Sequence, residues 1–105
     1  MTILDTHAPG EPRKLADDHE TQVEARGSRL LGLWAGGQMG LEEEHLQDYA
    51  AAVAALERPH GDGDAAVQKV ARDLTGAGLK ISPDYVQGKM NEFEAMARGQ
   101  LEAGS

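Results

Sequence analysis

Apolar residues recur at spacings of three and four in four stretches of this chain, and glycine or proline stands between one stretch and the next. The second stretch shows the pattern most clearly, with Leu46, Tyr49, Ala50, Val53 and Leu56. Because an α-helix has about 3.6 residues per turn, side chains at these spacings share one face. No run of alternating β-branched and aromatic residues indicates a strand. The pattern therefore predicts an all-α fold.

The glycines, prolines and capping residues predict four helices, at about 13–38, 41–57, 64–77 and 83–102. We expect glycines to end helices because they adopt left-handed backbone angles without strain, and we expect side-chain oxygens to cap helix starts. The terminating glycines are Gly36, Gly37, Gly40 and Gly78, and the starting residues are Asp62 or Asp64, and Ser82 with Pro83 and Asp84. Short connections between helices are typical of a four-helix bundle.

Each predicted helix has one face expected to lie in the core. The expected core residues outside the second helix are Val23, Gly27, Leu30, Leu31, Trp34, Val67, Val70, Ala71, Leu74, Val86, Met90, Phe93, Ala97 and Leu101. Trp34 is the largest of them, and an exposed Trp34 would instead be a candidate partner contact.

The first 12 residues are expected to be a flexible, disordered segment that precedes a bundle domain at 13–102. Pro9, Gly10 and Pro12 interrupt any helix before residue 13. A chain of 105 residues is long enough for one modest core and fits one domain.

The formal net charge of −8 argues against DNA, RNA or an anionic membrane surface as a partner. The chain has no cysteine, which excludes disulfides and thiolate chemistry. No apolar run approaches the ~20 residues of a membrane span, and the first residues do not form a signal peptide. We therefore expect a cytoplasmic protein without membrane insertion.

No arrangement of residues indicates catalysis, a metal or a cofactor. The four histidines lack paired-ligand spacing, and the loop around Asp62 and Asp64 lacks the pattern of a calcium site. Ser28, Ser82 and Ser105 are interpreted as helix surface, helix cap and tail rather than nucleophiles. We therefore predict that the chain is not an enzyme.

Four basic residues, Arg26, Arg29, Lys69 and Arg72, are candidate contacts for a nucleotide phosphate if the helices bring them together. Lys80 and Lys89 are further cations in the same part of the chain. The alternative interpretation is a set of separate surface ion pairs.

The stretch 26–35, which contains Leu30-Leu31-Gly32-Leu33-Trp34-Ala35 after two arginines, resembles the hallmark of the zeta subunit family. These proteins are inhibitors of the rotary ATP synthase in alphaproteobacteria. Further likenesses follow in the family's order. They are Tyr49-Ala50 and Val53, the loop 61–64, the turn 77–82, and Lys89-Met90 with Glu92. The resemblance covers about 14–101.

The resemblance implies a four-helix bundle whose N-terminal segment enters a catalytic interface of the ATP synthase head and blocks rotation in the direction of hydrolysis. The implied partner is this head, and the free protein is expected to be a monomer. The candidate partner-binding residues are Arg13, Lys14, Leu15, Ala16, Asp17 and Asp18. The family's phenylalanines are missing, since Phe93 is the first in the chain, so we expect weak inhibition.

Two other hypotheses remain open. The first is a bundle of the same family that has lost inhibition and binds a nucleotide or another protein. The second is a small enzyme, which has no acid–base or metal constellation in its favour.

Overall fold

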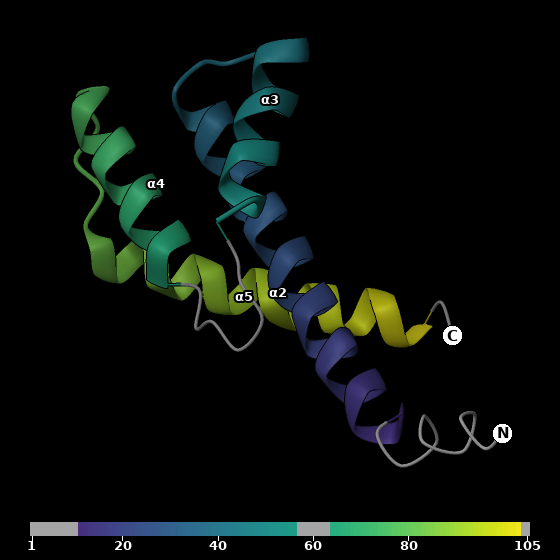
Figure 1. The fold of residues 1–105 in the computed structure, drawn as a ribbon. Helices are drawn as coiled ribbons and strands as arrows, with labels where there is room; N and C mark the ends of the chain where they lie inside the picture. Colours follow the sequence, from purple (N-terminus) through teal and green to yellow (C-terminus); the bar gives the residue numbers. More distant parts are fainter. Residues whose placement is uncertain (1–10, 57–63, 104–105) are drawn as a thin grey trace, which may run out of the picture.

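The computed structural model describes residues 11–56 and 64–103, and the side chains of 19–56 and 65–103. It contains four helices, α2 (Glu11–Gln38), α3 (Glu43–Ala54), α4 (Asp64–Gly76) and α5 (Pro83–Ala103), and no strand within the described ranges (Figure 1). The prediction of an all-α, four-helix fold is confirmed. The prediction for 1–10, and that for the loop 57–63, fall outside the described residues.

α2 is the longest helix and contacts the other three. α3 turns back along the C-terminal half of α2, so that Gly32 faces Ala50 and Gly36 faces Leu46. α5 runs antiparallel to α2 on another side, because Tyr85 lies beside Trp34 while Arg98 lies beside Glu20. α4 completes the bundle against α5, α2 and α3 (Figure 1).

The helix boundaries agree with the predicted ones to within three residues. α2 begins at Glu11, two residues before the expected start, because proline is tolerated in the first turn, where its missing N–H needs no partner. α3 begins at Glu43, later than expected, because Glu42 has an extended backbone, with φ −135° and ψ 156°. α3 also ends earlier, at Ala54.

Gly40 and Gly78 end their helices in the same way. Both have positive φ, 85° and 87°. After each glycine the next N–H turns back to a carbonyl five residues earlier, from Leu41 to Gly36 at 2.9 Å and from Leu79 to Leu74 at 3.0 Å. This is the Schellman pattern, which satisfies carbonyls left free at a helix end. The prediction for these two glycines is therefore confirmed, whereas Gly36 and Gly37 lie inside α2 and do not end it.

The buried core consists of aliphatic side chains and methionine. Its members are Val23, Leu31, Ala35, Ala50, Val53, Ala66, Val67, Val70, Ala71, Leu74, Val86, Met90 and Ala97. The stripe predicted for α4 is buried in full. No aromatic side chain belongs to this core, although all four are among the described residues.

Several expectations about individual side chains are wrong. Besides Trp34, the expected core residues Leu30, Tyr49, Leu56, Phe93 and Leu101 are only partly buried. Trp34 is only partly buried and packs against the edge of the core. Ser28 is not on the helix surface but fully buried, and its Oγ has no hydrogen-bond partner. In the helical repeat, Ser28 lies between the faces of α2 that contact the neighbouring helices. A side chain this small fits there even though it is polar.

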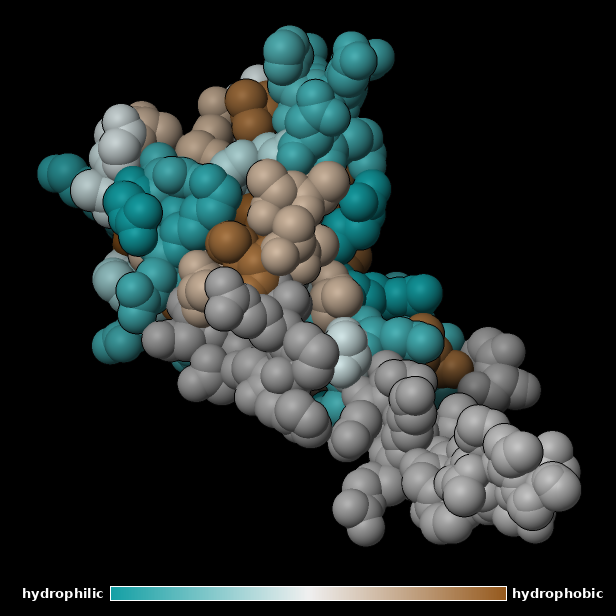
Figure 2. Space-filling model, in the orientation of Figure 1, coloured by the Kyte–Doolittle hydropathy of each residue, from teal (hydrophilic) through white to brown (hydrophobic). Residues whose placement is uncertain are grey.

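The surface is mainly hydrophilic on the face shown in Figure 2, where strongly hydrophobic residues appear only in small, separate areas. A hydrophilic region surrounds the start of α3, where Glu42, Glu43 and Glu44 are all exposed (Figure 2). No described helix is long and apolar enough to span a membrane.

Candidate functional site

The first turns of α2 extend beyond the other helices (Figure 1). We call residues 11–18 the α2 arm. The arm includes Arg13, Lys14, Leu15, Ala16, Asp17 and Asp18, the predicted partner-binding residues, whose backbone is helical and whose side chains lie outside the described ones. Among the described side chains of α2, which begin at His19, Val23 is the first buried core residue.

An ion pair joins α2 to α5 just after the arm. Arg98 donates to the Glu20 carboxylate, and both side chains are about half exposed. The hydrogen bond from Arg98 lowers the pKa of Glu20. Because both groups are solvated, the pair contributes little to stability. Its position nevertheless places the last helix of the bundle beside the base of the arm.

Arg26 and Arg29 lie in one surface hollow at the junction of α2, α3 and α5. The hollow is lined by Gln22, Ala25, Arg26, Arg29, Ala54 and Leu101. Arg26 donates a hydrogen bond of 3.4 Å to Oε1 of Gln100, and Arg29 donates to Oε1 of Gln47. Both guanidinium groups are exposed.

The other two predicted cations lie elsewhere. Arg72 lines a hollow between α4 and the start of α5 together with Gln68, Thr75 and Pro83. Lys69 forms an ion pair of 3.1 Å with Asp73, one turn along α4. The four candidate nucleotide contacts thus lie at three separate places on the surface. No described hollow is lined by all of them.

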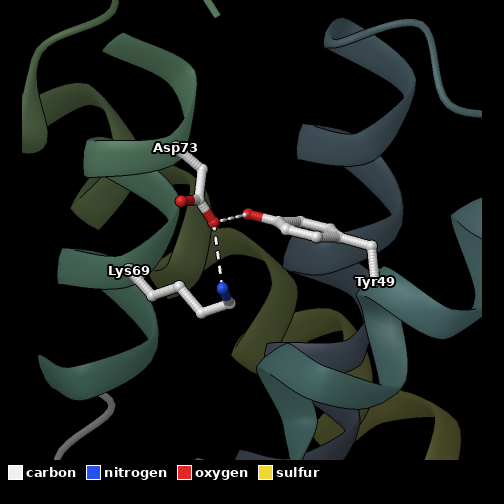
Figure 3. A network of polar contacts seen from close by, with 3 residues as sticks. All are labelled: Tyr49, Lys69 and Asp73. Carbon is white, nitrogen blue, oxygen red and sulfur yellow. Dashed lines mark hydrogen bonds and ion pairs between the residues drawn. The ribbon is translucent and has the colours of Figure 1, made fainter. Parts of the chain in front are cut away.

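Tyr49, Lys69 and Asp73 form a polar network between α3 and α4 (Figure 3). The Tyr49 hydroxyl donates a hydrogen bond of 2.8 Å to Oδ2 of Asp73, the same oxygen that pairs with Lys69. The Lys69 ammonium also lies 5.4 Å from the centre of the Tyr49 ring. Burial, and then the bond to Asp73, raise the pKa of Tyr49 well above its ordinary value. The network links two helices that otherwise share few contacts.

Replacing Tyr49 with phenylalanine should lower the unfolding free energy by about 0.5–1.5 kcal/mol near neutral pH, through loss of the bond to Asp73. The raised pKa means that this contribution is complete below the ordinary tyrosine pKa of 10.0 and declines as pH rises toward the folded-state value. Urea unfolding at neutral and alkaline pH should therefore show the two proteins converging above about pH 10. Tyr85→Phe, at a half-exposed ring, is the control. A difference between wild type and Tyr49→Phe that is the same at every pH would contradict the assignment.

Three of the four aromatic residues, from α2 and α5, meet at the edge of the core. The Lys89 ammonium lies 5.6 Å from the ring centre of Trp34, 6.0 Å from that of Tyr85 and 5.8 Å from that of Phe93. The Trp34 and Tyr85 ring centres are 6.0 Å apart. We call these four residues the aromatic–lysine surface. Sequence reasoning missed this surface, because it placed Trp34 and Phe93 in the core. The available signal was the spacing of four that separates Tyr85 from Lys89 and Lys89 from Phe93 on one helix.

No group of three or more potential ligands that could hold a metal ion occurs among the described residues.

Comparison with known proteins identifies the class that this arrangement belongs to. A family model described as ATPase inhibitor subunit zeta matches residues 1–100. The chain therefore belongs to the ATPase inhibitor subunit zeta family, a class of regulatory proteins, and the resemblance in its sequence is confirmed. No curated protein and no solved structure matched the chain.

Proposed function

We propose that this protein is a regulatory subunit that binds the catalytic head of the ATP synthase, through the α2 arm, and restrains ATP hydrolysis without catalysis of its own. It would act in the cytoplasm, at the membrane-bound synthase. The observation that carries the proposal is the projection of the arm beyond the bundle in a chain of an ATPase inhibitor family (Figure 1).

The arm suits insertion between subunits because it continues a helix that the bundle already stabilises. α2 has 28 residues and is therefore about 42 Å long at ~1.5 Å per residue. A segment that begins as an extension of a formed helix loses less conformational entropy on binding than an isolated peptide does. The bundle thus presents the arm in a conformation close to the one that binding requires.

The composition of the arm supports weak inhibition. Leu15 is its one sizeable apolar side chain, and burying it would contribute about 1.5–3 kcal/mol. Arg13 and Lys14 precede Asp17 and Asp18, so the arm carries both signs of charge and no aromatic residue. Interfaces of this kind usually gain much of their energy from aromatic side chains and arginine.

The alternative of a nucleotide-binding bundle has less support. A phosphate site would need several cations around one hollow, whereas Arg26 and Arg29 share a hollow that contains neither Lys69 nor Arg72. No second function is therefore proposed.

The test is steady-state ATP hydrolysis by the purified cognate head, with and without the full chain, together with a binding measurement. We expect binding, and inhibition that is weak and requires the arm. Leu15→Ala should weaken binding further, and a variant without residues 1–18 should not inhibit. Absence of binding by the full chain would refute the proposal. Strong inhibition that disappears on truncation would support the function and contradict only its expected weakness.

A further inference from the structure

The aromatic–lysine surface adjoins a hollow formed by the C-terminal half of α2, the connection between α4 and α5, and the start of α5. Trp34, Gln38, Lys80, Ile81, Ser82 and Tyr85 line this hollow. Ser82 shapes one wall by accepting a 3.1 Å hydrogen bond from the Tyr85 N–H at its Oγ, which caps α5. The hollow therefore lies between the C-terminal half of α2 and the connection that leads into the capped start of α5.

The aromatic residues of this surface lie at the edge of the core rather than inside it. The core is formed by aliphatic side chains and Met90, while Trp34 and Phe93 are partly buried and Tyr85 is 55 % exposed. Large aromatic side chains that remain exposed next to a hollow are typical of residues that dominate protein–protein binding. The feature thus indicates a surface for contact with another protein.

The charges at the hollow indicate what kind of segment fits it. The chain as a whole carries a formal net charge of −8, yet two lysines lie at this place. Lys80 is exposed at the hollow, and Lys89 lies over the Trp34 and Tyr85 rings. The acids nearby are Asp84, in the first turn of α5, and Glu92, whose Oε1 is 3.6 Å from the Lys89 ammonium. Lys80 is therefore available to a carboxylate of the occupant, and the rings to its apolar atoms.

We propose that the aromatic–lysine surface and its hollow dock an acidic segment of the catalytic head, as a second contact in addition to the α2 arm. This inference rests on the proposed function. Trp34 lies 16 residues after Asp18 on the same helix, which is about 24 Å at ~1.5 Å per residue. Two linked contacts at such a separation bind more tightly than either alone, because the second forms at a high effective concentration. The contact made by the bundle thus lengthens the time for which a weakly binding arm stays on the head.

The experiment measures the dissociation constant of full-length variants for the purified cognate head at low and at moderate salt. Tyr85→Ala removes the exposed ring, and Lys80→Glu reverses the available charge. Each has a matched control. Met96→Ala removes another exposed apolar side chain of α5 outside the hollow, and Arg72→Glu reverses an exposed charge on α4. We expect each test variant to weaken binding about tenfold or more, since central interface residues have effects of this size. The controls should stay within about twofold, as for residues outside an interface.

A second measurement reports on the aromatic–lysine surface itself. Trp34 is the single tryptophan of the chain, so 5-fluorotryptophan labelling gives one ¹⁹F resonance. Adding unlabelled head should shift and broaden the Trp34 resonance, and the change should be smaller in Tyr85→Ala. The far-UV circular dichroism spectrum of this variant should match that of wild type, which shows that the fold is kept. If wild type binds the head but both test variants bind equally well and the resonance does not respond, this inference is wrong while the proposed function stands. If wild type does not bind, both are wrong.

Discussion

Replacing Leu31 with alanine should lower the free energy of unfolding by about 2–5 kcal/mol, a large share of the ~5–15 kcal/mol that stabilises a domain of this kind. Leu31 is fully buried, and it belongs to the cluster that joins α2 to α3, α4 and α5. Its removal leaves a cavity that the neighbouring side chains cannot fill without moving. Urea unfolding followed by circular dichroism measures the change.

Trp34→Ala is the informative comparison for this variant. The indole is the larger side chain, but it is only partly buried, so its removal should cost about 1–2 kcal/mol, which is less than the loss expected at Leu31. A larger loss at Trp34 than at Leu31 would mean that the aromatic–lysine surface is part of the core and would remove the basis for a docking role.

Gly32→Ala should also destabilise the protein, although alanine is intrinsically better in a helix by about 1 kcal/mol. A Cβ at Gly32 would lie 2.7 Å from the Cα of Ala50 and 3.2 Å from the Cβ of Val53. The first of these is backbone of α3 and cannot rotate away, so α3 would have to move. We expect a net loss of about 1–3 kcal/mol, the usual range for overpacking.

Gly88→Ala is the matched control, because Gly88 is exposed inside α5 and a Cβ there meets nothing within 4 Å. It should gain about 0.5–1 kcal/mol from helix propensity alone. Thermal unfolding of both variants should thus give shifts of opposite sign. A gain at both positions would show that α2 and α3 are not in close contact at Gly32.

The fold could be predicted well because its main determinants are local. The helical spacing of Val67, Val70, Ala71 and Leu74 fixes one inward face, and Gly78 ends the helix through its own backbone angle. Gly36 was misassigned because a glycine near a helix end and a glycine at a helix contact look alike in sequence. Only the neighbouring Leu46, which a Cβ would approach to 2.6 Å, distinguishes them.

The candidate site was less predictable because it depends on long-range contacts. The arm residues Arg13 to Asp18 could be named from the resemblance to the zeta subunit family, and the sequence before Val23 is mostly polar. The aromatic–lysine surface could not, because Trp34 and Lys89 come from different helices and their 5.6 Å approach depends on how α2 and α5 pack. Hydrophobicity alone assigns a tryptophan to the core, whereas Trp34 is partly buried at the edge of the core.

The continuity of α2 also bears on which way the arm faces. Its first glycine is Gly27, so the stretch 13–26 is a helix with neither glycine nor proline, and the arm turns with the bundle as one body. The orientation in which the bundle meets the head would then determine which face of the arm points inward. Inserting one residue between Asp18 and Val23 would advance the arm by only ~1.5 Å but rotate it by about 100°, which would exchange the side chain that meets the partner. The helix therefore determines which face of the arm points toward the partner as well as how far the arm extends.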